Sequence, residues 1–179
     1  MSVELRTQRL HLIAATVEAA RAELENRAEL ERLLGARLPA HWPPPLNDDD
    51  SARFFLTYLT EHPSHVGWMA WYFVTSGSRV VIGNGGFTGA PKDGAVEIGY
   101  SIVSQFQRRG FASEAVRALV EWAFSHRSVD RVVARTLPDN AGSRALLGKL
   151  GFRETAPLEP GMLRFELERC DARGPVAQR

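Results

Sequence analysis

In the middle of the chain, the spacing of hydrophobic residues changes from a period of two to a helical period. Along residues 95–103 apolar and polar or small residues alternate, with Val96, Ile98, Tyr100 and Ile102 on one face, and this period of two predicts a β-strand. After Gly110 the apolar positions recur at helical spacing, which predicts an amphipathic helix. These positions are Ala112, Ala115, Val116, Leu119, Ala123 and Phe124. Gly110 therefore lies where a strand gives way to a helix.

The same criteria predict the remaining elements. Further strands are predicted at residues 9–14, 68–75, 79–88, 131–136 and 162–168. Further helices are predicted at residues 17–34, 47–61 and 140–150. Gly35 is expected to end the first helix, because glycine commonly follows a helix C-terminus. Residues 37–45 carry four prolines, which exclude a helix interior or a central strand, so a loop is predicted there.

The order of these elements indicates the fold class. Short turns at residues 76–78 and 90–94 connect three strands, which predicts an antiparallel meander. A helix, a strand, a helix and a strand follow, so we expect an α+β fold with a central, mostly antiparallel mixed sheet and helices on both faces. The 179 residues are enough for one domain with a substantial core. We assign residues 1–170 to that domain and expect residues 171–179 to form a flexible tail.

Composition and charge narrow the function classes. Hydrophobic residues make up 44% and charged residues 24% of the chain, which is typical of a soluble globular protein. A net charge of +1 provides no overall field for nucleic acid or an anionic membrane, so neither is expected as a partner. The longest apolar run is too short for a membrane span and no signal-peptide pattern opens the chain, so a cytoplasmic location is expected. Cys170 is the single cysteine, which excludes an intrachain disulfide and a cysteine-ligated zinc site, and no metal is expected.

Three other features suggest chemistry but have simpler explanations. A glycine cluster at residues 83–86 follows a strand, yet a dinucleotide site requires a helix next and another strand comes instead, so a bent or bulged strand is expected. Three aspartates at residues 48–50 are explained by helix capping and the helix dipole. His62 and His65 flank Pro63 with no evident partner, so they are expected on a surface loop.

The turn at residues 107–112, Gln-Arg-Arg-Gly-Phe-Ala, has the properties of an anion-binding site. Gly110 and Ala112 allow a ligand close to the backbone, and the first N–H groups of a helix have no intrahelical acceptors. The helix dipole adds about 0.3 to 2 kcal/mol, and Arg108 and Arg109 supply cations. An ordinary strand-to-helix turn with two exposed arginines is the alternative.

The pattern Gln107-x-x-Gly110-x-Ala112 resembles the pyrophosphate-binding motif of the GNAT superfamily of acetyl-CoA-dependent N-acyltransferases. Residues 140–152 are similar to a second block of that superfamily, Asn-x-x-Ser followed by Lys-x-Gly-Phe. Residues 7–12 are similar to the opening strand of the branch that contains the RimJ and RimL ribosomal-protein acetyltransferases. The resemblance implies a GNAT fold, in which a parallel strand pair splays apart, with acetyl-CoA as cosubstrate.

The resemblance also implies where acetyl-CoA is held. It assigns the pyrophosphate to the backbone of the turn, and the pantetheine arm and acetyl oxygen to backbone groups at the end of the splayed strand. Strand-core packing is the alternative for Ile102 and Val103. The implied acetyl-CoA contacts are Ile102, Val103, Gln107, Arg108, Arg109, Gly110, Phe111, Ala112, Ser113, Asn140, Ser143 and Lys149.

Two residues are candidates for proton transfer. Most members of the superfamily carry a tyrosine as general acid where this chain has Leu147, whereas RimL-like members place a serine where Ser143 falls, so Ser143 is the candidate acid. Helix capping by Asn140, with Ser143 in the first turn, explains the same pair structurally. Glu97 is the candidate base, acting through water, and a solvated or salt-bridged glutamate is its alternative.

The acceptor pocket is expected to use aromatic residues. His41 and Trp42 lie in the proline-rich loop, and Trp68 and Trp71 lie on the first long strand. Core packing is the alternative for these aromatic side chains.

Together these features predict acetyl transfer to a primary amine by direct attack in a ternary complex. The opening segment favours a protein N-terminal α-amine, with a small-molecule amine second. The balanced net charge argues slightly against an enzyme that docks on the ribosome, which would profit from a basic face. A non-catalytic acyl-CoA-binding module of the same fold is the alternative, favoured by Leu147 and opposed by Glu97 and Ser143. A monomer and a homodimer are both compatible with the sequence.

Overall fold

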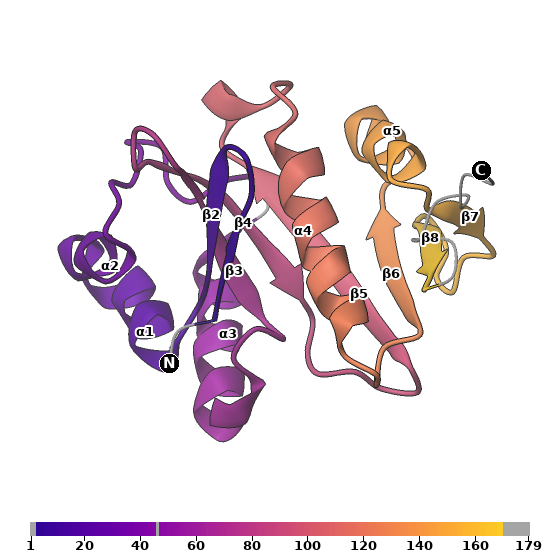
Figure 1. The fold of residues 1–179 in the computed structure, drawn as a ribbon, viewed down its shortest axis with the longest axis horizontal. Helices are drawn as coiled ribbons and strands as arrows, with labels where there is room; N and C mark the ends of the chain where they lie inside the picture. The colour runs from indigo at the N-terminus through magenta and orange to yellow at the C-terminus, as the bar shows by residue number, and fades with distance from the viewer. Residues whose placement is uncertain (1–2, 46, 170–179) are drawn as a thin grey trace, which may run out of the picture.

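The computed structural model describes residues 3–45 and 47–169, so the tail predicted at 171–179 lies outside the described residues (Figure 1). The strands are β1 (Glu4–Arg6), β2 (Leu10–Ala14), β3 (Ala70–Thr75), β4 (Val81–Phe87), β5 (Ala95–Ile102), β6 (Arg131–Thr136), β7 (Arg153–Thr155) and β8 (Leu163–Glu168). The helices are α1 (Val17–Glu25), α2 (Arg27–Leu34), α3 (Asp49–Glu61), α4 (Phe111–Ser125) and α5 (Ala141–Lys149), with short 3₁₀ turns at Pro63–His65 and Ser104–Phe106.

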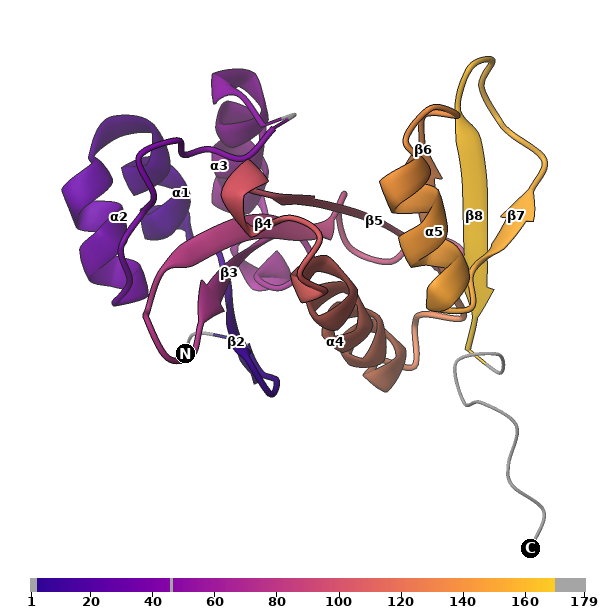
Figure 2. The same ribbon diagram turned by 90° about the horizontal axis from the view of Figure 1, so that it is seen from above.

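One mixed sheet organises these elements. Its strand order is β1-β2-β3-β4-β5-β6-β8-β7. Strands β5 and β6 are parallel, and the other neighbouring strands are antiparallel. Helices α1, α2 and α3 cover one face of the sheet and α4 covers the other, with α5 on the side of α4 (Figure 2). The predicted fold class, a mostly antiparallel mixed sheet between helices, is confirmed.

The sheet separates two hydrophobic cores, because side chains alternate between the faces of each strand. Trp71 and Phe73 of β3 pack with Leu119 of α4 in one core. Tyr72 of the same strand packs with Leu30 of α2 in the other. Strand β3 is therefore buried on both faces, which explains its nearly continuous apolar sequence.

The predicted helix at 17–34 is two helices in the structure, and this expectation is corrected. Asn26 has extended backbone angles (φ −154°, ψ 93°), and its N–H donates to the Ala22 carbonyl and closes α1. Its side chain accepts a hydrogen bond from the Glu29 N–H at 3.1 Å and caps α2. Gly35 follows α2 in the left-handed region (φ 54°), as predicted. Strands β1 and β7 were not predicted, because three residues are too few to show a period.

The glycine cluster at residues 83–86 forms an irregular part of β4, as predicted. Phe73 pairs with Gly83 and Val74 with Val81, so Ile82 is an extra residue that bulges the strand. Gly86 has φ 145°, and a Cβ there would lie 1.8 Å from the Met69 carbonyl oxygen. Glycine is therefore required at position 86, because the carbonyl of Met69, just before β3, approaches it so closely.

We expect Gly86→Ala to lower the free energy of unfolding by about 3 kcal/mol. The new methyl group would clash with the Met69 carbonyl, and a positive φ is strained for alanine. Gly77→Ala is the matched control, since a Cβ at Gly77 meets nothing within 4 Å. Urea denaturation measures both. Equal stabilities of the two variants would contradict the assigned close approach.

Candidate active site at a splayed strand pair

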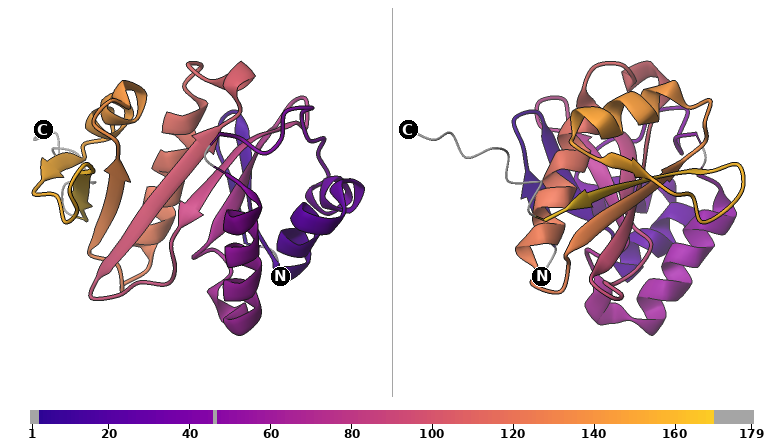
Figure 3. Two further views of the ribbon diagram at one scale, coloured as in Figure 1. Left: turned by 180° about the vertical axis from the view of Figure 1, so that it is seen from behind. Right: turned by 90° about the vertical axis from the view of Figure 1, so that its right-hand side faces the viewer.

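The parallel strands β5 and β6 separate after a short paired segment. Their pairing runs from Ala95 opposite Arg131 to Ile98 opposite Ala134. Beyond it β5 continues to Ile102 and β6 to Thr136, and the two strands diverge (Figure 3, left). The N-termini of α4 and α5 both lie at the open end of this divergence (Figure 1). The predicted splay is thus a feature of the structure.

The register determines which backbone groups face the gap. Glu97 accepts a hydrogen bond from the Thr88 N–H at 3.0 Å, and Val103 donates to the Ile82 carbonyl at 2.9 Å, so odd-numbered residues of β5 bond towards β4. Backbone groups alternate between the two sides of a strand, and the even-numbered Tyr100 and Ile102 therefore direct theirs into the gap.

The resemblance assigned Ile102 and Val103 to the gap, but the alternation directs only the backbone groups of Ile102 into it. The N–H of Val103 bonds to β4, and its carbonyl accepts the Phe106 N–H at 2.8 Å, so neither group is directed at a ligand. The carbonyl of Ile102 accepts the Gln107 side-chain amide at 2.8 Å. That contact gives Gln107 a structural function, since it closes the end of β5.

A cleft of about 1030 Å³ occupies the gap, which is at the upper end of the usual range for small-molecule sites. Tyr100 and Ile102 line it from the side of α4, and Gly99 and Ser101 from the side of α3. The cleft therefore passes through the sheet. The sequence-derived candidates that line it are Ile102, Gln107, Arg108, Gly110, Phe111, Ala112, Ser113, Asn140, Ser143 and Lys149.

The turn before α4 has an open helix N-terminus. Gly110 is the N-cap residue in the left-handed region (φ 81°), and within the described chain no side chain caps the helix. Ala112 and Ser113 of the first turn line the cleft, together with Arg108. Free first-turn N–H groups beside a cation suit an anionic ligand. Arg109 is not part of the cleft lining; its guanidinium lies 5.9 Å from the centroid of the Phe106 ring.

Residues near the start of the chain hold this turn in place. Glu114 of α4 accepts hydrogen bonds from the Thr7 hydroxyl at 2.5 Å, the Arg9 N–H at 2.8 Å and the Arg9 Nε at 2.7 Å. The Arg9 guanidinium also donates to the Arg109 carbonyl at 3.0 Å and lies 4.5 Å from the centroid of the Phe111 ring. Burial acts to raise the pKa of Glu114, but these hydrogen bonds and the Arg9 charge outweigh it and lower that pKa.

A pair of hydroxyl groups spans the gap. The Tyr100 hydroxyl on β5 lies 2.9 Å from the Ser143 Oγ on α5, and both residues line the cleft. Burial raises the pKa of Tyr100, against the effect of the hydrogen bond to Ser143, so the phenol stays protonated around neutral pH. Asn140 accepts the Ser143 N–H at 3.0 Å, which makes Asn140 the N-cap of α5. Leu147 is fully buried in the core.

Sequence reasoning did not select Tyr100, Arg9 or Glu114. Tyr100 was counted with the apolar face of its strand, and α5 is what brings Ser143 to its hydroxyl. Glu114 has the position of a solvent-facing residue in a helix, and its partner Arg9 is 105 positions away. Neither contact has a local sequence pattern.

Glu97 forms an ion pair beside the cleft. Its Oε1 lies 2.7 Å from the Nε of Arg135, and a second nitrogen of Arg135 lies 3.0 Å from Glu159. Arg135 lines the cleft, whereas Glu97 is not among the lining residues. The salt bridge that the sequence left open as an alternative for Glu97 is therefore present, and Arg135 is the member of the pair that lines the cleft.

The aromatic acceptor candidates are divided between locations. Trp42 lines a smaller pocket on the face of α1 and α3. His41, the preceding residue of the loop, is exposed. Trp68 and Trp71 lie on the opposite face, where Trp68 packs 4.5 Å from Trp122 between ring centroids and Trp71 is fully buried. Neither the Trp68 nor the Trp71 side chain lines the cleft, so these two residues are not part of the candidate site.

The histidine pair and the aspartate run have structural partners. Asp48 caps α3 by accepting the Ser51 N–H at 2.9 Å. The ring of His65 hydrogen-bonds the Tyr58 hydroxyl at 2.9 Å. Within residues 3–45 and 47–169, no cluster of three or more metal-binding side chains is found, and no helix is long and apolar enough to cross a membrane.

Comparison with known proteins agrees with the fold. The family model described as Acetyltransferase (GNAT) domain matches residues 9–153. The chain belongs to the GNAT acetyltransferase family and is an acyltransferase. The Bacillus subtilis protein named uncharacterized N-acetyltransferase YjdG is 31% identical over 153 residues, which cover 84% of this chain and 89% of that protein.

Solved structures show the same fold at low sequence identity. A ribosomal-protein alanine acetyltransferase from Vibrio fischeri has a TM-score of 0.64 at 18% identity, covering 93% of this chain and 97% of that one. A RimL ribosomal-protein acetyltransferase in complex with coenzyme A has a TM-score of 0.62 at 20% identity, covering 95% of this chain and 99% of that one. The GNAT fold expected from the sequence motifs is thus confirmed.

We expect Glu114→Gln to lower the free energy of unfolding at pH 7 by about 2 kcal/mol, because the charged partner of Thr7 and Arg9 is lost. The folded-state pKa of Glu114 lies below its ordinary value of 4.5, so its stabilisation is present above that value and is lost as the pH falls through the folded-state pKa. The difference between wild type and variant should therefore shrink in acid. Denaturation curves from pH 7 to pH 3 measure it, with the exposed Glu121→Gln as control. A pH-independent difference would contradict this assignment.

Proposed function

We propose that this protein transfers the acetyl group of acetyl-CoA to a primary amine by direct attack within a ternary complex. The observation that supports this most is the cleft through the sheet, with an uncapped helix N-terminus at one side and a hydroxyl pair across the gap. Donor and acceptor can reach each other from opposite faces of such a cleft.

The residues present fit acetyl-CoA. The first-turn amides of α4, with Arg108 beside them, suit the pyrophosphate. The backbone groups that Tyr100 and Ile102 direct into the gap have no strand partner there, so they suit an extended arm that replaces the missing strand. Asn140 and Lys149 line the same cleft at α5. When bound, acetyl-CoA supplies the activated thioester on which the transfer depends.

The side chains then have distinct functions. A backbone N–H directed into the gap stabilises the carbonyl oxygen as the amine nitrogen attacks, and such a donor is worth about 3 to 4 kcal/mol. As the carbon–sulfur bond breaks, Ser143 would donate its proton to the departing sulfur and receive one from Tyr100, which would then regain a proton from solvent. The proton released by the amine passes through water to Glu97 or to solvent. The pair of hydroxyls substitutes for the tyrosine that Leu147 replaces.

The acceptor assignment follows the relatives. The solved neighbours include ribosomal-protein acetyltransferases, which supports a protein N-terminal α-amine. An α-amine, with a pKa near 8, is partly neutral at physiological pH and places little demand on a base. A small-molecule amine is equally compatible with a cleft that is open on the face of α3.

A non-catalytic acyl-CoA-binding module is the second candidate function. Leu147, which is buried and cannot transfer a proton, favours it. The Tyr100–Ser143 pair favours the enzyme, since a binding module has no need of two hydroxyls across the gap.

Substituting Gly110 with valine should weaken acetyl-CoA binding at least about tenfold, which corresponds to about 1.4 kcal/mol. The β-branched side chain is strained at φ 81° and covers the first-turn amides. Calorimetric titration with acetyl-CoA measures the change. Gly148→Ala on α5 is the control, because a Cβ there meets nothing within 4 Å. Intact affinity in the Gly110 variant would refute the phosphate assignment.

Release of free CoA in the presence of a panel of amines and N-terminal peptides tests the activity itself. We expect Ser143→Ala and Glu97→Gln each to lower kcat about tenfold or more, with little change in the KM of acetyl-CoA. Glu159→Gln is the matched control for Glu97, because it removes the other carboxylate that pairs with Arg135. Tight cofactor binding without release by any acceptor would favour the binding module. A kcat that is unchanged in Glu97→Gln would exclude Glu97 as the base and leave it only its ion pair with Arg135.

A further inference from the structure

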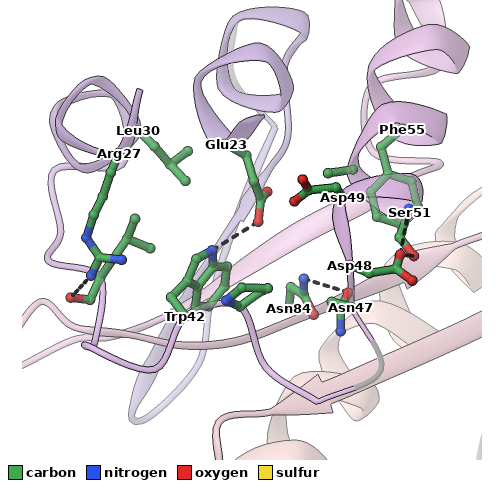
Figure 4. Close-up of a pocket in the computed structure, with 13 residues that line it drawn as sticks. Glu23, Arg27, Leu30, Trp42, Asn47, Asp48, Asp49, Ser51, Phe55 and Asn84 are labelled. Atoms are coloured by element: carbon green, nitrogen blue, oxygen red, sulfur yellow. Dashed lines mark hydrogen bonds between the residues drawn. The ribbon is translucent and has the colours of Figure 1, made fainter. Parts of the chain in front are cut away.

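A second, smaller pocket adjoins the cleft on the face of α1 and α3. It has a volume of about 150 Å³ and lies between these helices and the proline-rich loop (Figure 4). A cavity of this size holds a group of about six non-hydrogen atoms, as benzene in an engineered cavity shows. Asn47, Ser51, Phe55 and Asn84 line both spaces, so the pocket is a continuation of the cleft.

The wall between the two spaces is fixed by hydrogen bonds. Asn84 of β4 donates to the Asn47 side chain at 3.0 Å, and Ser101 of β5 donates to the Pro45 carbonyl at 2.7 Å. Asn84 and Ser101 are opposite each other in the sheet. The pocket therefore begins at Asn84, which lies opposite the residue that follows Tyr100 on β5, on the face from which the acceptor would approach.

Glu23 of α1 is a half-buried carboxylate at this pocket. One of its oxygens accepts the Trp42 Nε1–H at 3.0 Å, and the other accepts the Tyr72 hydroxyl. A carboxylate has about four lone-pair positions, so these two donors leave capacity for a ligand. Burial raises the pKa of Glu23, and the two hydrogen bonds only partly offset that effect. A cation brought into the pocket would favour the ionised carboxylate.

The surrounding side chains also suit a cation. Asp48 and Asp49 line the pocket with Glu23, and the Trp42 and Phe55 rings provide aromatic surface. Asp48 also caps α3, and Asp49 lies 3.5 Å from Arg53 at the surface, so Glu23 is the principal carboxylate of the pocket. Figure 4 shows the carboxylates of Glu23 and Asp49 directed into the same space. Arg27 is the one cationic residue of the described lining. Its guanidinium donates to the Leu38 and Pro39 carbonyls at 2.7 and 2.8 Å, turned away from Glu23.

We propose that this pocket binds a second, protonated amino group of the acceptor, and that the acceptor is accordingly a short diamine or a comparable cationic amine. The inference rests on the proposed acetyltransferase function and specifies its substrate class. The neutral amino group attacks at the splay, while Glu23 holds the protonated end in the pocket. Burial of Glu23 beside Trp42 makes the pocket selective for a compact cation over a neutral alkyl group.

Binding to the CoA complex tests the pocket without requiring turnover. Calorimetric titration compares 1,3-diaminopropane, 1,4-diaminobutane and 1,5-diaminopentane with monoamines of equal length. We expect at least one diamine to bind about tenfold or more tighter than its monoamine, and Glu23→Gln to reduce that ratio to less than about threefold. Glu29→Gln is the matched control, because that carboxylate pairs with Arg32 on the surface of α2. Ala52→Leu, which fills the pocket from α3, should have the same effect as Glu23→Gln.

The outcomes separate this inference from the proposed function. If wild type shows no preference for any diamine, or if the preference survives both Glu23→Gln and Ala52→Leu, the pocket does not bind the cationic end. Acetylation of peptides or monoamines without diamine preference would leave the enzyme in place and overturn the pocket assignment. Diamine binding that depends on Glu23, with no CoA release, would support the pocket and refute the transferase.

Discussion

The divergence of β5 from β6 is the constraint on which the rest of the site depends. Four residues of each strand pair, and then the backbone groups of Tyr100 and Ile102 face a gap. Buried backbone groups left without partners cost free energy, so the end of a strand is opened this way only where something else can satisfy them. Gln107 satisfies the carbonyl of Ile102 from within the chain. The remaining donors are directed into the cleft, where an extended ligand can take the place of a strand. The same opening admits Ser143 to within hydrogen-bond distance of Tyr100, so ligand binding and proton transfer share one structural cause.

The walls of the cleft are anchored independently, and this keeps the gap open. Helix α4 packs under β3 through Leu119, and Glu114 ties its first turn to Arg9 at the other end of the sheet. Helix α5 is held by Leu147, which is fully buried in the core. The loop on the opposite face is held by Ser101 and Asn84. The cleft is thus bordered by elements that are each held by contacts of their own.

Much of the fold could be predicted because its central elements have strong periods. Strand β5 begins and ends within one residue of expectation, and helix α4 begins within one residue of it, since the change from period two to helical spacing is unambiguous there. The break at Asn26 was missed because the residues around it continue a helical pattern, and the cap depends on one side chain. In the site, residue types singled out the turn at residues 107–112, and all of its residues except Arg109 line the cleft, whereas its binding of a phosphate stays a prediction. Whether Tyr100 or Val103 directs its backbone groups into the gap depends on the register of β5 against β4. The Glu114 contacts join residues about a hundred positions apart. A single sequence carries no pattern for either.

The two faces of the cleft differ in charge, and this difference bears on how substrates are sorted. On the face of α4, Arg108 and Lys149 stand near amides that favour an anion. On the face of α3, Glu23 and Asp49 favour a cation. The sheet lies between these regions. Arg135 also lines the cleft, but its charge is paired with Glu97 and Glu159, so the unpaired charges on the two sides are of opposite sign. Repulsion of wrongly placed charges contributes to specificity as much as attraction does. A diphosphate entering from the acceptor side would meet carboxylates, and a cationic amine entering from the cofactor side would meet arginine and lysine. A cleft that crosses a sheet can thus bind two oppositely charged substrates in a fixed orientation, although the chain as a whole is nearly neutral.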